Sequence, residues 1–204
     1  MSKLKIAVII SSTRPTRFGE LPAKWILDKA NERPELDAEI VDIRDFDLPF
    51  FDEMASNLWM PSQNANAVKW LNKISEFDGY IFVTAEYNRS ITGALKNALD
   101  QAYVNWNKKP FGVVAYGSVG GTRATEHLRT IGVELQMVST RSAVHIGGAD
   151  FMAVHPGFGG TKSLTDIEAS IGASAKDMLD QLTWWASATL SARNDDAVAA
   201  KAAE

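Results

Sequence analysis

The sequence of 204 residues contains no cysteine. This absence excludes disulfide bonds, thiolate nucleophiles and cysteine-ligated metals. If the protein carries out redox chemistry, a bound cofactor must therefore carry the electrons. Histidine is also scarce, and His127, His145 and His155 lack the spacing of metal ligands. We therefore expect no metal site.

Positive charge and long apolar runs are lacking as well. The formal net charge is −4 and the isoelectric point is near 5.4, whereas a nucleic-acid-binding protein usually carries a basic stripe. No apolar run approaches the roughly 18 residues of a membrane span. Residues 1–3 lead directly into the first predicted strand, which leaves no room for a signal peptide. We expect no nucleic-acid or membrane partner and a cytoplasmic location.

Short apolar runs alternate with segments of helical spacing along the chain. Five such runs predict short strands, at residues 6–10, 38–43, 80–84, 111–116 and 143–146. This order predicts an α/β fold, a flavodoxin-like three-layer sandwich in which a five-stranded parallel sheet has the order 2-1-3-4-5. We expect one domain over residues 1–190, ending in a long helix over 164–190, and a flexible C-terminal tail over 191–204.

The loop after the first predicted strand, SSTRPTRFG at residues 11–19, combines hydroxyl groups with two arginines. A strand, such a loop and the start of a helix form a typical anion site, because loop and helix N–H groups point at the ligand. Arginine adds paired donors that match phosphate oxygens. The loop lacks both the Walker ending and the G-x-G-x-x-G fingerprint. The pattern favours a phosphate site, with a solvated turn as the alternative.

Two further polar loops, at residues 85–92 and 117–121, follow the third and fourth predicted strands. The carboxyl ends of parallel strands meet at one edge of the sheet, so the three loops are predicted to converge. Tyr87 offers a flat surface for a planar ring, Asn88 can donate and accept, and GSVGG lets backbone N–H groups approach a ligand. Phosphate at one end and a heterocycle at the other favour FMN. Tyr87 as a core residue and Glu86 as an ion-pair partner remain alternatives.

The segment 44–65 is long, irregular and rich in aromatic residues and methionine. A loop of this length inside a compact domain is usually functional or interfacial. The segment could be buried against a second subunit or could fold over its own core, and the sequence leaves both open.

Three motifs resemble those of the NAD(P)H-dependent FMN reductases, a family that includes quinone, azo and chromate reductases. SSTRPTRFG is similar to the phosphate loop of that family, AEYNRSITGALKNALD to its P-E-Y-N segment, and YGSVGGTRATEHLR to its G-x-x-G-G-x-R-A segment. The resemblance covers roughly residues 4–190. The chain departs from the family pattern at Ser11, Thr16, Ala85 and Thr92.

The resemblance implies a set of cofactor-binding residues. The FMN phosphate would be held by Ser12, Thr13, Arg14 and Arg17, and the ring and ribityl chain would lie along Glu86, Tyr87 and Asn88. The pyrimidine end of the ring would be lined by Ser118, Val119, Gly120 and Gly121. The set is completed by Phe18, Gly19, Ala85 and Gly117. No side chain is expected to act as a catalytic nucleophile. The family's usual assembly implies a homodimer or homotetramer.

The leading hypothesis is therefore a flavoenzyme. NADPH or NADH would pass a hydride to bound FMN, and a quinone or similar small acceptor would take the electrons in a second, ping-pong half-reaction. One alternative is a flavin reductase that releases reduced FMN to a partner monooxygenase. Another is a flavodoxin-like electron carrier without NAD(P)H turnover.

Overall fold

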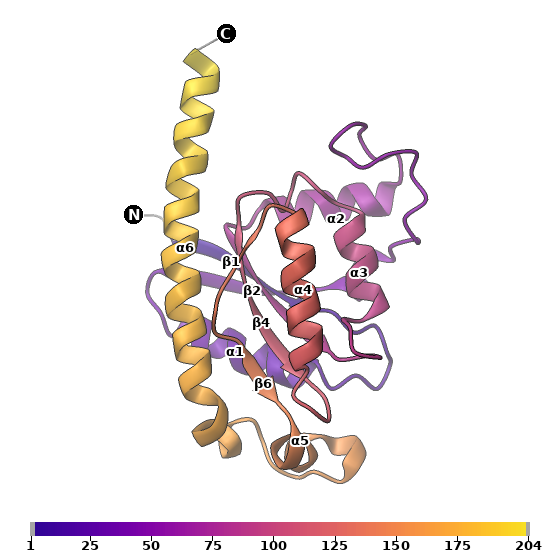
Figure 1. Ribbon diagram of the computed structural model, residues 1–204, viewed down its shortest axis with the longest axis vertical. Helices are drawn as coiled ribbons and strands as arrows, with labels where there is room; N and C mark the ends of the chain where they lie inside the picture. Colours follow the sequence, from indigo (N-terminus) through magenta and orange to yellow (C-terminus); the bar gives the residue numbers. More distant parts are fainter. Residues whose placement is uncertain (1–2, 203–204) are drawn as a thin grey trace.

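The computed structural model describes residues 3–202 and has a parallel sheet as its central layer (Figure 1). The strands follow the order β2-β1-β3-β4-β5, and β6 also pairs with β4, which confirms the predicted flavodoxin-like order. The strands are β1 (Leu4–Ile10), β2 (Leu36–Asp42), β3 (Gly79–Ala85), β4 (Pro110–Tyr116), β5 (Val138–Ser139) and β6 (Val144–Ile146).

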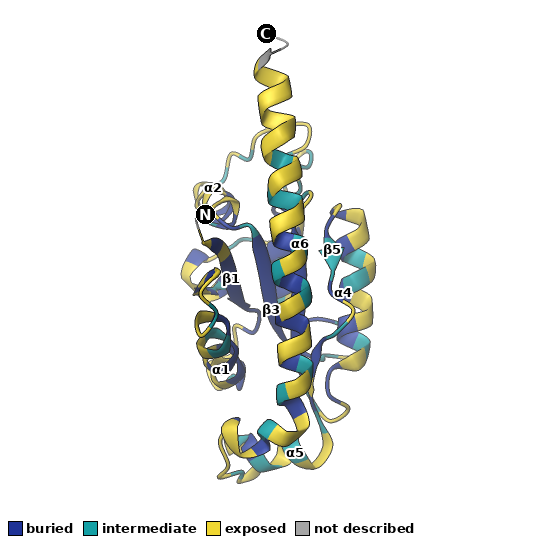
Figure 2. Cartoon of the chain, turned by 90° about the vertical axis from the view of Figure 1, so that its left-hand side faces the viewer, coloured by how far each residue is buried: buried dark blue, intermediate teal, exposed yellow. Residues whose placement is uncertain are grey.

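Helices cover both faces of the sheet. They are α1 (Glu20–Asn31), α2 (Ala65–Ser75), α3 (Gly93–Asp100), α4 (Thr122–Glu134), α5 (Gly148–Val154) and α6 (Glu168–Ala202). One core lies between the sheet and α1, α5 and α6, and the other lies under α2, α3 and α4. Every residue of β3 and of β4 is buried, which explains why their sequences are apolar throughout instead of alternating (Figure 2).

The fifth predicted strand, residues 143–146, is β6, and a further two-residue strand, β5, precedes it. β5 pairs with Pro110 and Phe111 at the start of β4, and β6 pairs with residues 114–116 at its end. The residues between β5 and β6 leave the sheet, and there Arg129 of α4 donates to the carbonyl groups of Thr140 and Arg141. The sequence did not predict β5, because a segment of two residues is too short to establish a period.

The C-terminal half differs from expectation in two further places. Residues 147–160 are rich in glycine, a composition that favours a loop, yet they contain helix α5. The predicted helix end at residue 190 was wrong, since α6 continues to Ala202 and projects beyond the sheet (Figures 1 and 2). Arg193 donates to Asp78, and Lys108 pairs with Asp196. The part of α6 beyond residue 190 therefore has tertiary contacts that could not be predicted from its sequence.

No helix within the described residues is long and apolar enough to cross a membrane.

Candidate functional site

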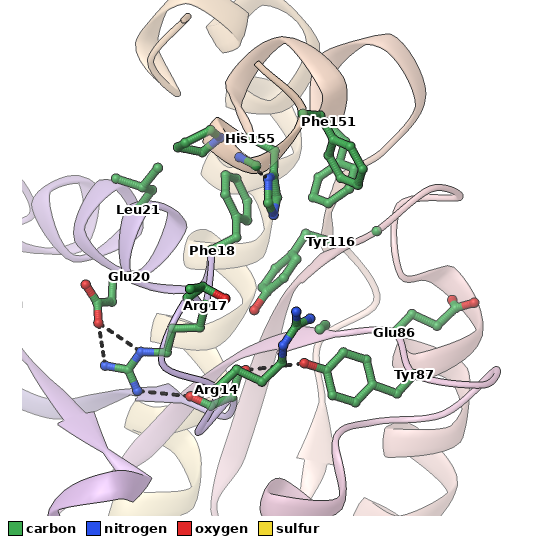
Figure 3. Close-up of a pocket in the computed structure, with 17 residues that line it drawn as sticks. Arg14, Arg17, Phe18, Glu20, Leu21, Glu86, Tyr87, Tyr116, Phe151 and His155 are labelled. Carbon is green, nitrogen blue, oxygen red and sulfur yellow. Dashed lines mark hydrogen bonds and ion pairs between the residues drawn. The ribbon is translucent and has the colours of Figure 1, made fainter. Parts of the chain in front are cut away.

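The loops that follow β1, β3 and β4 converge at the carboxyl edge of the sheet, as predicted. They border a cavity of about 880 Å³ that is closed on its far side by α5 and the turn after it (Figure 3). The size suits a drug-sized ligand or a nucleotide cofactor. Its lining comprises Ser12, Arg14, Thr16, Arg17, Phe18, Glu20, Leu21, Ala85, Glu86, Tyr87, Tyr116, Gly117, Phe151, His155, Pro156, Gly157 and Phe158.

Arg14 supplies the available positive charge of the cavity. Its side chain is exposed and makes no ion pair with any described residue. The Tyr87 hydroxyl is the main cause that raises the pKa of Arg14 above its usual value, so the guanidinium stays charged. The same hydroxyl lies 3.4 Å from Ser12 Oγ, which places the loops after β1 and β3 in contact. Figure 3 shows Arg14 between the rings of Tyr87 and Tyr116.

Arg17 lies in the same loop but has a different environment. Its guanidinium donates to both carboxylate oxygens of Asp42, to Glu20 and to the Ser12 carbonyl, and its side chain is only 3% exposed. Burial alone would raise the pKa of Asp42, but the hydrogen bonds from Arg17 and Arg44 outweigh it and hold that pKa below its usual value. The charge of Arg17 is therefore already neutralised by protein groups (Figure 3).

Aromatic side chains form the wall opposite Arg14. The Phe18 ring stacks on His155 at 5.0 Å between centroids and meets the edge of Tyr116 at the same distance. Phe151 and Phe158 extend this surface around His155. Burial lowers the pKa of His155, with Arg14 as a further cause, and Nδ1 of His155 accepts from the Gly157 N–H. The neutral ring therefore has its proton on Nε2, where it can donate.

The loop after β4 brings its backbone close to the sheet. Gly120 and Gly121 have φ values of 74° and 67°. A Cβ on Gly121 would lie 2.6 Å from Ala115 Cβ, so no other residue fits without movement. Gly121 precedes the first residue of α4, so this close approach packs the start of the helix against the end of β4.

The structure places many of the predicted residues in this cavity. Ser12, Arg14, Arg17, Phe18, Ala85, Glu86, Tyr87 and Gly117 line it, whereas Thr13, Gly19, Asn88, Ser118, Val119, Gly120 and Gly121 lie outside its lining. Glu86 is 5% exposed and pairs with Arg123, which agrees with the ion-pair alternative left open by the sequence. Gly19 is packed against Tyr116, whose hydroxyl would lie 2.9 Å from an added Cβ.

Sequence reasoning missed the aromatic wall. Tyr116 ends a buried strand, and Phe151 and His155 are four residues apart, the spacing of one helix face. That spacing was the available signal, but glycines on both sides of the segment favoured a loop.

The polar end of the cavity has the donors that a phosphate group requires. Arg14 offers an uncompensated guanidinium, and Ser12 and Thr16 add hydroxyl groups. Ser11 Oγ, at the start of the same loop but outside the cavity lining, is buried and has no hydrogen-bond partner within residues 3–202. In the same part of the chain, no group of three or more His, Asp or Glu residues could hold a metal ion.

Comparison with known sequences gives a consistent set of matches. The model of the NADPH-dependent FMN reductase family matches residues 4–150. An NAD(P)H-dependent FMN reductase of Nectria sp is 38% identical over 130 residues, which cover 61% of this chain and 65% of that protein. A quinone reductase of Pseudomonas putida strain KT2440 is 30% identical over 152 residues, covering 71% and 78% of the two chains.

The fold is shared with solved flavoenzyme structures. FerB from Paracoccus denitrificans, an NAD(P)H:(acceptor) oxidoreductase, superposes with a TM-score of 0.64. The alignment covers 91% of this chain and 98% of that one at 22% sequence identity. At this identity the likeness concerns the fold.

Proposed function

The chain belongs to the NADPH-dependent FMN reductase family, and on this basis we propose that it reduces quinone-type acceptors with NAD(P)H in a ping-pong cycle at the cavity bordered by the three loops. Family membership makes it a flavin-dependent NAD(P)H oxidoreductase. The order of the half-reactions and the class of acceptor are the parts that we propose.

The observation that supports this function best is the pairing of the exposed Arg14 guanidinium with an aromatic wall across a single cavity. Arg14 and the hydroxyl groups beside it suit a phosphate, and the rings of Phe18, Tyr116 and His155 suit a flat apolar group. FMN has both features. When bound, FMN supplies the hydride-accepting chemistry, which no protein side chain offers.

The residues of this chain would bind and orient. We assign the phosphate to Arg14, Ser12 and Thr16, with Arg17 holding the loop in shape through Asp42. Asn88 and the backbone of residues 117–121 would contact the ring, as the family resemblance implies. His155 Nε2 can donate to an oxygen on the substrate without changing its own charge.

The reaction balances without a catalytic side chain. NAD(P)H loses a hydride and becomes NAD(P)+, and a quinone gains that hydride together with a proton from solvent to become a hydroquinone. The relatives named quinone reductases support this acceptor class. Because donor and acceptor would use the same opening in turn, double-reciprocal rate plots at several acceptor concentrations should be parallel. Intersecting lines would exclude the ping-pong order.

The experiment that tests the cofactor assignment is flavin titration of the purified protein. We expect FMN bound in a one-to-one complex and bleached by NADPH without oxygen. Arg14→Ala should weaken FMN binding by about 1.5–3 kcal/mol, the scale of a charged hydrogen bond. Arg141→Ala, which removes an exposed arginine outside the cavity, is the matched control. Equal affinity of the two variants would exclude Arg14 as a phosphate ligand.

The same titration separates the alternatives. FMN that leaves the protein on reduction would favour a flavin reductase that supplies a monooxygenase. Bound FMN that NADPH and NADH both fail to bleach would favour an electron carrier.

We also propose that the chain forms a homodimer or a homotetramer through the loop between β2 and α2. Phe50, Met54 and Trp59 are 86%, 89% and 79% exposed there, a concentration of apolar surface that is unusual on a monomer. Asn97, Asn57 and Glu53 hold this loop by hydrogen bonds, so it is an ordered surface. Light scattering should give a multiple of the 22.3 kDa chain mass, and Trp59→Ser together with Met54→Ser should lower it. A monomeric wild type would exclude this assembly.

A cytoplasmic location stays a prediction.

A further inference from the structure

The turn that carries Asn88 has an unfavourable backbone. Tyr87 and Ser90 exchange two backbone hydrogen bonds of 2.9 and 3.0 Å, which closes a two-residue turn. Asn88 and Arg89, the two residues at its tip, have φ values of 50° and 68°. Turns of this kind favour glycine, and a residue with a side chain adopts the left-handed region at an energetic cost. Contacts from outside the turn must therefore stabilise it.

The first of these contacts holds the residue before the turn. The Glu86 side chain is 5% exposed, and the Arg123 backbone N–H donates to its Oε2 at 3.1 Å. The Arg123 guanidinium pairs with Oε1 of the same carboxylate. Arg123 is in the first turn of α4, where the helix dipole also favours a negative charge. Glu86 is thus bound to α4 at both of its oxygen atoms.

The second contact holds the last residue of the turn. Ser90 Oγ and His127 Nδ1 are joined by a hydrogen bond of 2.6 Å. His127 follows Arg123 by four residues, so both side chains project from one face of α4. The turn is therefore held before its first residue and at its last residue by one rigid element.

We propose that Arg123 and His127, which we call the α4 clamp, are positioning residues that set the place of Asn88 in the flavin site. This inference rests on the proposed function, in which Asn88 contacts the flavin ring. Glu86 then acts through its hold on the turn instead of binding the cofactor. The family resemblance had placed Glu86 along the ring, whereas its carboxylate faces α4.

The first test needs no cofactor. In the apoprotein, the amide N–H groups of Tyr87 and Ser90 report directly on the turn, since each donates across it. His127→Ala should speed their hydrogen exchange by about tenfold, while amides in the middle of β3 keep their rates. Glu126→Ala, the adjacent exposed position on α4, is the matched control and should leave all of these rates unchanged. Unchanged exchange at Tyr87 and Ser90 in His127→Ala would overturn the clamp.

The second test measures FMN affinity by fluorescence quenching. His127→Ala and Ser90→Ala should each weaken binding about fivefold, and the double variant should be no weaker than either one, because a single hydrogen bond is lost in all three. His127→Gln keeps a group that can bond Ser90 and should recover most of the affinity. Additive losses would overturn the proposal, as would affinities equal to that of the wild type.

Arg123 can be examined by the same titration. Arg123→Lys keeps the charge opposite Glu86, so its FMN affinity should lie between those of wild type and Arg123→Ala. The flavin midpoint potentials of the three proteins should follow the same order. If Arg123→Ala does not fold, the His127 and Ser90 series decides the matter alone. A wild-type protein that binds no FMN would instead contradict the proposed function, whereas normal FMN binding with an insensitive His127→Ala contradicts only the clamp.

Discussion

The two edges of the sheet differ in whether their buried or charged polar groups have partners within the protein. At the amino edge, Lys109 is 8% exposed, and its Nζ lies 3.1 Å from the Tyr80 hydroxyl and within 3.5 Å of two carbonyl groups. Asp78 accepts from Arg193 and from the backbone of Lys5, both at 3.0 Å. The charges and hydroxyls of this cluster are satisfied by other protein groups, so the cluster contributes to stability.

At the carboxyl edge, two polar groups are left without compensation. Arg14 is exposed and has no ion pair among the described residues, and Ser11 Oγ is buried without a hydrogen-bond partner among them. Such features cost stability and are tolerated where a ligand uses them. The comparison indicates that function can be located in this fold by the polar groups that the protein leaves unsatisfied.

The largest expected effect on stability would come from adding a side chain at Gly121, where the loop after β4 packs closely against the strand. Gly121→Ala would force a left-handed alanine against Ala115 Cβ and the Tyr116 backbone nitrogen, 2.6 and 2.9 Å away. Strain and overpacking together should lower the free energy of unfolding by about 4 kcal/mol. Urea denaturation measures it. Gly93→Ala, where an added Cβ meets nothing within 4 Å, should instead be neutral or stabilising. Similar losses in both variants would contradict this account.

A second effect belongs to the amino edge and depends on pH. Burial, with repulsion from Arg193 as a lesser cause, lowers the pKa of Lys109 to about 8 from its usual 10.5. Between these values the unfolded chain binds more protons than the folded one, so stability rises with pH. The rise should total on the order of 3 kcal/mol, from about 1.4 kcal/mol for each pKa unit.

Replacing the buried amine isolates this effect. Lys109→Met keeps the length of the side chain and removes the titration, so the rise in stability between pH 8 and pH 10 should be lost in urea denaturation curves. Lys24→Met, at an exposed position of α1, should keep the rise. If Lys109→Met and wild type have the same pH dependence, the amine is not the cause.

The difference between the edges also explains what the sequence could predict. The strand order and the convergence of three loops followed from apolar runs and from the rule that parallel strands share a carboxyl edge. Both depend on local patterns. That Arg14 is free while Arg17 is neutralised by Asp42 could not be read from sequence, because the two arginines lie in one loop and Asp42 is 25 residues away. The same holds for Glu86, whose partner Arg123 belongs to another helix.

A smaller effect is expected from the link between α6 and the amino edge. Arg193 donates to Asp78, to the Lys108 carbonyl and to Thr189, and its side chain is 20% exposed. Arg193→Ala should lower the free energy of unfolding by about 2 kcal/mol, since it leaves a half-buried carboxylate with one donor fewer. FMN affinity should not change, because the proposed flavin site lies at the opposite edge. A loss of flavin binding without a loss of stability would contradict the division between the edges.

The smallest effect should come from the exposed ion pair beside that link. Lys108 and Asp196 are 2.7 Å apart, but their side chains are 59% and 63% exposed, so water competes for both charges and salt screens them. Lys108→Ala should change the free energy of unfolding by less than about 0.5 kcal/mol, and thermal melts in low and high salt should differ little from those of wild type. The Arg193–Asp78 and Lys108–Asp196 contacts hold the same part of α6. A loss of stability from Lys108→Ala as large as that from Arg193→Ala would mean that the strength of these contacts depends on charge and not on burial.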